Sequence, residues 1–202
     1  MAEFFNIVIH AMLVENLALV FLLGMCTFIA VSRQVSTAIG LGIAVILVQL
    51  ITVPINNLIY VHLLAPGALA WAGFPSVDLS HLRFITFIGL IAALVQILEL
   101  VLERYFRRLH DALGIFLPLL TVNCAILGAS LLMVQREYSF IDSVAYATGV
   151  GVGWALAVVL FAAIRERLRY SDIPDGLQGL GMAFVVAGFL AFGFAGISGI
   201  EF

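Results

Sequence analysis

The feature that most constrains this chain is a series of six long apolar stretches separated by short polar connections. The stretches cover residues Phe4–Val31, Ala38–Leu64, Phe84–Leu102, Leu113–Val134, Phe140–Ile164 and Leu177–Gly199. A helix that crosses a bilayer needs about 20 mostly apolar residues. Backbone polar groups in lipid must find partners inside the protein, which favours helices. We therefore predict an all-α integral membrane protein with six transmembrane helices.

The composition leaves little sequence for a soluble domain. Of the 202 residues, 64% are hydrophobic and 10% are charged, whereas soluble domains carry about 25% charged residues. The net charge of −3 provides no basic surface for nucleic acid. The first apolar stretch lacks the basic start and the small-residue cleavage site of a signal peptide. We expect a single membrane domain over residues 1–202, with the first stretch retained as a span.

The distribution of arginine predicts how the helices are oriented. The chain has no lysine, and cytoplasmic loops of membrane proteins are enriched in cationic residues. The first, third and fifth connections contain seven arginines: Arg33, Arg104, Arg107, Arg108, Arg165, Arg167 and Arg169. The second and fourth contain Arg83 and Arg136. This asymmetry places the odd connections in the cytoplasm and both termini outside it.

The six spans divide into two halves of three, residues 1–106 and 107–202. Because three is odd, a duplicated three-helix unit must lie upside down relative to its copy. One cysteine falls in the first span of each half, Cys26 and Cys124. Inverted repeats commonly place a binding site near the middle of the membrane, on discontinuous helices. The predicted fold is therefore two inverted three-helix repeats.

Both cysteine-bearing spans contain residues that interrupt a membrane helix. The first span contains Glu15, Asn16 and Gly24, and the fourth contains Pro118 and Asn123. Proline removes a helical hydrogen bond, and polar side chains compete for backbone groups. We expect the first and fourth helices to be interrupted.

The two cysteines have three interpretations. Free cysteine commonly packs as a small buried hydrophobe. A disulfide would require the two backbones to lie within about 7 Å. Thiolates also ligate iron–sulfur clusters, but a cluster held by cysteine alone needs four of them. Cys26 and Cys124 could therefore be metal ligands only if a homologous partner supplied two more thiolates.

Acidic residues inside the spans are candidates for a cation path. A carboxylate within a membrane is costly and often functional. Glu99 lies deep in the third span, on one helical face with Gln96 and Glu103. The alternative interpretation of Glu99 is a structural acid that forms hydrogen bonds between helices. Glu103 is spaced to pair with Arg107.

Glu15 is the second cation-path candidate, and it would share a helical face with Cys26 if the first helix were continuous. Glycine-rich runs at 40–42 and 149–153 predict close helix packing. The four histidines are too scattered to coordinate a metal together. No Ser/His/Asp or Cys/His catalytic set is present, so we assign no catalytic residue.

Several stretches resemble one family closely. They are 14–19 (VENLAL), 23–28 (LGMCTF), 53–57 (VPINN), 84–89 (FITFIG), 113–119 (LGIFLPL), 121–126 (TVNCAI), 163–167 (AIRER) and 170–174 (YSDIP). The chain resembles the family of E subunits of bacterial Na⁺-translocating NADH:quinone oxidoreductases, among the related Nqr and Rnf membrane subunits. The resemblance runs over essentially the whole chain.

The resemblance implies an electron-relay component of a Na⁺-pumping translocase. The D and E subunits of this family pair as pseudo-symmetric mates that share an intramembrane [2Fe–2S] cluster, whose ligand positions correspond here to Cys26 and Cys124. The implied route runs from the NADH-oxidising F subunit to the FMN of the C subunit, coupled to Na⁺ export and ubiquinone reduction, with the A and B subunits completing the complex. This chain would bind neither NADH nor flavin. Glu99 occupies a position associated with Na⁺ uptake in the family.

Two alternatives remain. The first is the A subunit of the Rnf electron-transport complex, whose first span typically has two asparagines where this chain has Glu15 and Asn16. In that Rnf subunit, proline typically follows the first cysteine, where this chain has Thr27. The second alternative is a small cation transporter or channel whose cysteines only pack.

Overall fold

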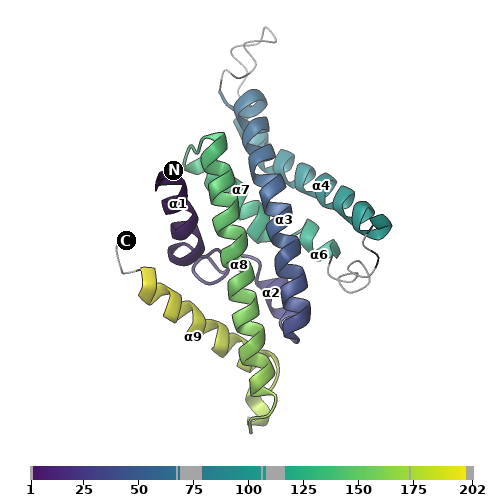
Figure 1. The fold of residues 1–202 in the computed structure, drawn as a ribbon, viewed down its shortest axis with the longest axis vertical. Helices are drawn as coiled ribbons and strands as arrows, with labels where there is room; N and C mark the ends of the chain where they lie inside the picture. Colours follow the sequence, from purple (N-terminus) through teal and green to yellow (C-terminus); the bar gives the residue numbers. More distant parts are fainter. Residues whose placement is uncertain are drawn as a thin grey trace.

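The computed structural model describes residues 2–66, 68, 79–105, 107, 117–172 and 174–198, and its helices and connections contain no β-strand in those ranges. Two long helices, α3 (Val35–Ile59) and α8 (Phe140–Leu168), run side by side through the centre (Figure 1). A π-helical turn, η2 (Tyr60–Leu64), extends α3. The all-helical architecture agrees with the all-α part of the predicted fold class.

Glycines on two faces of α8 let it pack closely against two neighbours. A Cβ at Gly151 would lie 3.1 Å from Cα of Ile46 on α3. On another face, a Cβ at Gly153 would lie 2.7 Å from the carbonyl oxygen of Met12, in the π-helical turn η1 (His10–Val14) that follows α1 (Ala2–Ile9). Small residues permit such close approach in membrane helices, as predicted for the run at 149–153.

The segment around each cysteine contains a break between two short helices. After η1, residues 15–24 leave the helical path, and α2 (Met25–Val31) begins only beyond them. In the second half, α6 (Leu117–Thr121) is separated from α7 (Cys124–Gln135) by two residues. The Leu113–Phe116 part of the predicted fourth span, Arg108 and the residues after 198 lie outside the described part of the chain.

Two helices lean away from the central pair on opposite sides (Figure 1). They are α4 (Arg83–Tyr105), which follows the short helix η4 (Ser80–Leu82), and α9 (Leu180–Ser198), which follows η5 (Asp175–Leu177). Each long central helix is thus followed by a helix that diverges from it.

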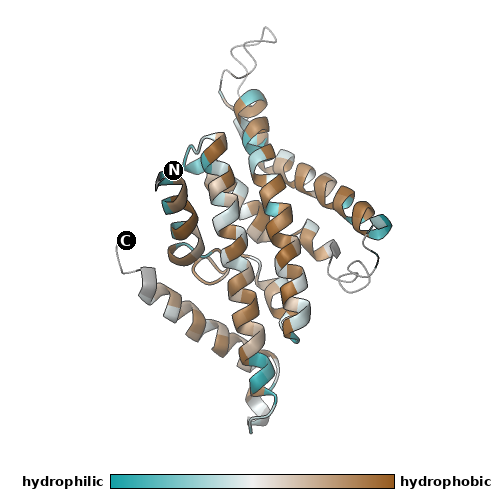
Figure 2. Ribbon diagram, viewed as in Figure 1, coloured by the Kyte–Doolittle hydropathy of each residue, from teal (hydrophilic) through white to brown (hydrophobic). Residues whose placement is uncertain are grey.

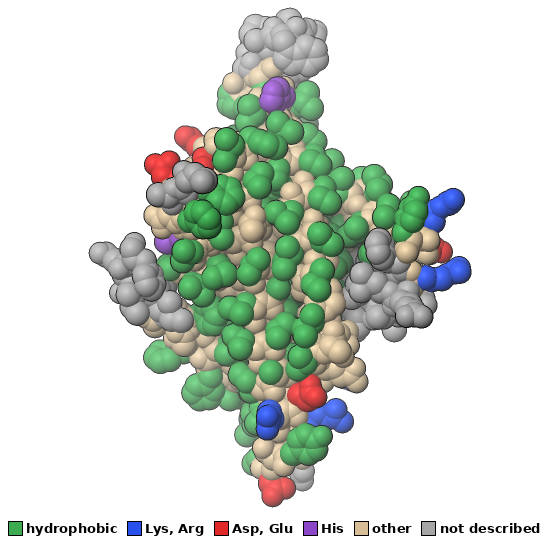
Figure 3. Space-filling view, viewed as in Figure 1, with side chains coloured by type: hydrophobic (Ala, Val, Ile, Leu, Met, Phe, Trp, Pro, Cys, Tyr) green, Lys and Arg blue, Asp and Glu red, His purple; other side chains and the backbone are tan. Residues whose placement is uncertain are grey.

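Three helical segments are long and apolar enough to cross a bilayer: Val35–Leu64, Ser80–Tyr105 and Phe140–Leu168. Three further apolar helices of 10–17 residues cover Glu3–Val14, Leu119–Gln135 and Leu180–Gly196. Apolar residues dominate the helices, and hydrophilic ones gather toward helix ends (Figure 2). The visible surface has the same pattern, with apolar side chains over its middle (Figure 3). These features are those of a membrane protein.

Candidate metal centre at the junction of two broken helices

Asn16 explains why the first helix breaks where it does. This side chain is fully buried. Its Nδ2 donates to the carbonyl oxygens of Gly153, at 2.8 Å, and Met12, at 3.1 Å. Its Oδ1 accepts from the backbone N–H groups of Ala18 and Leu19. This one amide side chain thus pairs with backbone groups near the break that a continuous helix would have paired. Its bond to Gly153 also connects the break to α8.

Asn123 plays a corresponding part at the second break. It is the N-cap of α7, where its Oδ1 accepts from the backbone N–H of Ala125 at 2.9 Å. Its Nδ2 donates to Oγ1 of Thr27 at 3.4 Å, and that hydroxyl donates to the carbonyl oxygen of Gly24 at 2.8 Å. The two breaks, about a hundred residues apart in sequence, are therefore connected by hydrogen bonds.

Both cysteines lie at this junction. Cys124 is the first residue of α7, and its Sγ accepts a hydrogen bond from the backbone N–H of Gly24 at 2.9 Å. Cys26 follows Gly24 by two residues, in the first turn of α2. Both thiols are free and both are exposed on the surface of this chain. The structure brings together the two residues predicted as metal ligands, and neither is a buried packing residue.

The backbone at Gly24 fits the junction only because it lacks a side chain. Its φ of +81° is in the left-handed region. A Cβ there would lie 2.8 Å from Nε1 of Trp154, 3.0 Å from Oδ1 of Asn123 and 3.2 Å from Cβ of Ala125. The Trp154 indole is fully buried, and its N–H has no hydrogen-bond partner among the described residues. The junction thus contains a buried indole N–H close to the backbone of Gly24 and without a partner among the described residues.

This donor set suits half of a thiolate-ligated iron–sulfur site. The Cys124 sulfur accepts the backbone N–H of Gly24 and stands at the start of α7. Within the described ranges, no group of three or more His, Cys, Asp or Glu side chains could hold a metal ion. The two cysteines therefore need further ligands from outside this chain to complete a four-thiolate site.

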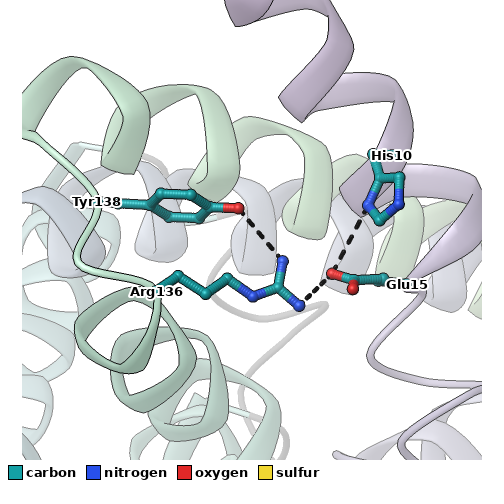
Figure 4. Close-up of polar contacts among 4 residues, drawn as sticks. All are labelled: His10, Glu15, Arg136 and Tyr138. Carbon is teal, nitrogen blue, oxygen red and sulfur yellow. Dashed lines mark hydrogen bonds and ion pairs between the residues drawn. The ribbon is translucent and has the colours of Figure 1, made fainter.

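Glu15 lies in an ion-pair network just after η1. Its Oε2 pairs with Nη2 of Arg136 and lies 3.7 Å from Nδ1 of His10, while Nη1 of Arg136 donates to the Tyr138 hydroxyl at 3.3 Å (Figure 4). The side chains of Glu15 and Arg136 are about three-quarters buried, at 24% and 25% exposure. The helix ends at Val14, so it is not continuous from Glu15 to Cys26, and the condition under which these two residues would share a helical face is not met.

The network keeps Arg136 charged. Burial lowers the pKa of its guanidinium, but hydrogen bonds to Tyr138 and Glu15, together with nearby negative charge, raise it by more, so the net pKa lies above the ordinary value. The guanidinium carbon also lies 5.5 Å from the ring centroid of Tyr146. Sequence reasoning missed this network, because no local signal links residue 15 to residue 136.

Glu99 lies at the edge of the buried face of α4. Gln96 Nε2 donates to its Oε2 at 3.3 Å, which confirms that these two residues share a face. Glu99 comes four residues after the buried Val95 and three residues before the buried Leu102, so it borders the buried face of the helix. Glu99 is half-buried and Glu103 is exposed. The pairing of Glu103 with Arg107 stays a prediction.

Asn56 and Asn57 on α3 are buried amides for which sequence patterns predicted no role of their own. Asn56 donates to Oγ of Ser130 at 2.7 Å, and Asn57 donates to the carbonyl oxygen of Tyr138 at 2.8 Å. Gln49 is fully buried, and its amide has no hydrogen-bond partner among the described residues. The two asparagines link α3 to α7 and to the connection that follows it.

Comparisons with known proteins place the chain in a family. A family model described as "Rnf-Nqr subunit, membrane protein" matches residues 4–201. The chain is 61% identical to the E subunit of the Na⁺-translocating NADH-quinone reductase of Psychromonas ingrahamii, over the full length of both. It is 60% and 58% identical, again over both full lengths, to proteins of the same name from Pseudoalteromonas translucida and Maridesulfovibrio salexigens. This chain therefore belongs to the Rnf-Nqr family of membrane subunits.

Proposed function

We propose that this chain is the E-type membrane subunit of a Na⁺-translocating NADH:quinone reductase, in which Cys26 and Cys124 supply half the ligands of a [2Fe–2S] cluster. The observation that carries the proposal is the junction of the two breaks. There the backbone N–H of Gly24 donates a hydrogen bond to the Cys124 sulfur, and Gly24 is only two residues before Cys26. Two free, exposed thiols on connected helix breaks suit a site completed by a partner. The homologous D-type subunit is that partner in this proposal.

The cluster, when bound, would supply one-electron transfer between the NADH-oxidising F-type subunit and the flavin of the C-type subunit. This chain's residues would hold and orient its half of the site. Asn16 and Asn123 fix the two breaks, and the backbone N–H of Gly24 donates a hydrogen bond to the Cys124 sulfur. Donors near ligating sulfur tune reduction potentials. NADH, flavin and quinone would be bound by other subunits.

The proposed topology is six spans in two inverted halves. The order of a broken helix, a long central helix and a diverging helix occurs twice along the chain, as α1–α2, α3, α4 and as α6–α7, α8, α9. The arginine distribution supports both termini in the periplasm of the inner membrane. A periplasm-dependent reporter fused after Phe202 should be active, and one fused near Arg167 should be silent; the reverse pattern would refute this orientation.

Glu99 and Glu15 remain the proposed cation-path residues. Of the two, Glu99 is the stronger candidate, because the Glu15 carboxylate already has a cationic partner in Arg136. A half-buried carboxylate on a membrane helix is stabilised when a cation approaches it.

The Rnf complex is the second candidate, because the matching family description covers both groups. The names of the 58–61% identical relatives favour the quinone reductase. A transporter with structural cysteines is disfavoured by the exposure of both thiols, since packing cysteines are buried.

Iron content tests the proposal. The chain expressed alone should hold little or no iron, and co-expression with the D-type subunit should give about two irons per pair. Cys26→Ser and Cys124→Ser should abolish this iron. Met25→Leu, a volume-conserving change beside Cys26, should retain it. A fully loaded cluster in the chain alone, or full iron content in a cysteine variant, would contradict the shared site.

A further inference from the structure

An open pocket of about 610 Å³ lies at the end of the molecule where α8 ends and α9 begins. The pocket adjoins the end of α2, where Arg165 bonds to Ile29 and Ser32, whereas Cys26 is in the first turn of that helix. Cationic side chains, drawn in blue, and acidic ones, drawn in red, both lie at this lower end of the molecule (Figure 3). Nothing in the proposed electron relay uses this pocket.

Three arginines line the pocket. Arg33 comes from the turn between α2 and α3, and Arg165 and Arg169 come from one face of the end of α8. Arg165 is fixed in place, because its Nη1 donates to the carbonyl oxygen of Ile29 at 2.9 Å and to Oγ of Ser32 at 2.6 Å. Three like charges around one cavity repel each other, so an anion bound among them would be stabilised.

The chemistry of the lining favours phosphate. Guanidinium groups bind phosphate oxygens through paired, charge-assisted hydrogen bonds. The first turn of α9 also borders the pocket, through Met182 and Ala183. The free backbone N–H groups at a helix start favour an anion nearby. The neighbouring acid Glu166 is on α8, and its Oε2 accepts a hydrogen bond from the backbone N–H of Val35 at 3.3 Å.

The pocket also has an apolar side that a free anion would not use. Leu168, Met182 and Ala183 are part of the lining. The beginning of α9 continues this apolar character outward, where Leu180 is 63% exposed and Phe184 is 57% exposed. A ligand with a phosphate at one end and a hydrocarbon chain at the other would match both parts.

We propose that this pocket binds the phosphate headgroup of an anionic phospholipid, with its acyl chains lying along the start of α9. Basic pockets between membrane helices are known to bind lipid headgroups in this way. The competing occupant is an acidic segment of a protein partner. The exposed apolar side chains of α9 favour the lipid, because an acidic segment would leave them uncovered.

The test uses the purified complex and native mass spectrometry. The probes are dioctanoyl-phosphatidylglycerol, dioctanoyl-phosphatidylcholine and glycerol 3-phosphate. The pocket variant is Arg33→Gln/Arg169→Gln, with Arg165 left intact because it also bonds to the backbone of α2. The control variant is Arg104→Gln, an exposed arginine at the end of α4 that is not part of the pocket lining.

We expect the native complex to bind phosphatidylglycerol about tenfold or more tightly than either other probe, because only this lipid carries both a net negative headgroup and acyl chains. The pocket variant should lose about tenfold in affinity, and Arg104→Gln should match the native complex. Equal binding of phosphatidylcholine, preferential binding of glycerol 3-phosphate, or unchanged lipid affinity in the pocket variant would overturn the proposal. Loss of another protein of the complex with lipid binding unchanged would also overturn it, and would assign the pocket to a protein contact instead.

Discussion

Gly24 occupies the tightest backbone position at the junction of the broken helices. Its left-handed φ costs a residue with a side chain about 1–2 kcal/mol, and a Cβ would meet the Trp154 indole at 2.8 Å. We expect Gly24→Ala to destabilise the protein by about 2 kcal/mol or more. It should also lower iron content, because it displaces the N–H that donates to Cys124.

Thermal unfolding of the purified complex and an iron assay check this expectation. Gly89→Ala is the matched control, because the space around Gly89 on α4 is open within 4 Å. Alanine is the better helix former there, so the melting temperature should stay the same or rise. If both variants keep native stability and iron content, Gly24 does not constrain the site.

The ion pair between Glu15 and Arg136 makes a second prediction at the residue scale. Glu15→Gln or Arg136→Met alone leaves one charge three-quarters buried without its partner. Each should cost about 1–3 kcal/mol, between the values for exposed and fully buried pairs. The double variant should cost clearly less than the sum of the single variants. Denaturation of all four proteins measures the coupling, and strictly additive costs would show that the pair contributes nothing.

At the scale of single elements, sequence patterns predicted helices better than they predicted contacts between them. The polar residue Asn123 before an apolar run is a local N-cap signal, and α7 begins directly after it. Asn16 gives no such local signal for its full role, since its partner Gly153 lies 137 residues away. The ion pair of Glu15 depends equally on tertiary structure, so it could not be predicted from the sequence.

The lengths of the spans were also predicted less well than their helical character. Periodicity correctly placed Gln96 and Glu99 on one face of α4. The six apolar stretches became three long and three shorter apolar helices in the described part of the chain. One reason that some helices are shorter than the predicted spans is that residues 15–24 divide the segment around Cys26. In those residues side-chain hydrogen bonds replace helical ones.

The position of Glu99 on α4 leads to a functional prediction. If Glu99 serves a cation path, Glu99→Gln should preserve assembly and iron content but raise the Na⁺ concentration needed for half-maximal quinone reduction. Glu103→Gln is the control, because Glu103 is an exposed acid one turn farther along α4. Steady-state rates against Na⁺ concentration provide the measurement. An unchanged Na⁺ dependence in assembled Glu99→Gln complex would assign Glu99 a structural role.

At the scale of the whole molecule, the exposed surface is typical of a membrane protein that contacts both lipid and partner proteins. Both thiols are exposed, and the diverging helices α4 and α9 present apolar side chains such as Ile85 and Phe192, at 72% and 81% exposure. Lipid and partner proteins can cover such surfaces. These features suit a chain that forms half of a paired structure and brings two thiols to a shared site.

The most direct test of the electron-relay role is stopped-flow flavin reduction in assembled complexes carrying Cys26→Ser or Cys124→Ser. A hydroxyl is a much poorer ligand than a thiolate for iron in clusters. NADH should still reduce the cofactors of the F-type subunit, while the flavins of the C-type and B-type subunits stay oxidised on the turnover timescale and quinone reduction falls to background. Rapid reduction of those downstream flavins in either assembled variant would contradict the electron-relay role of this chain.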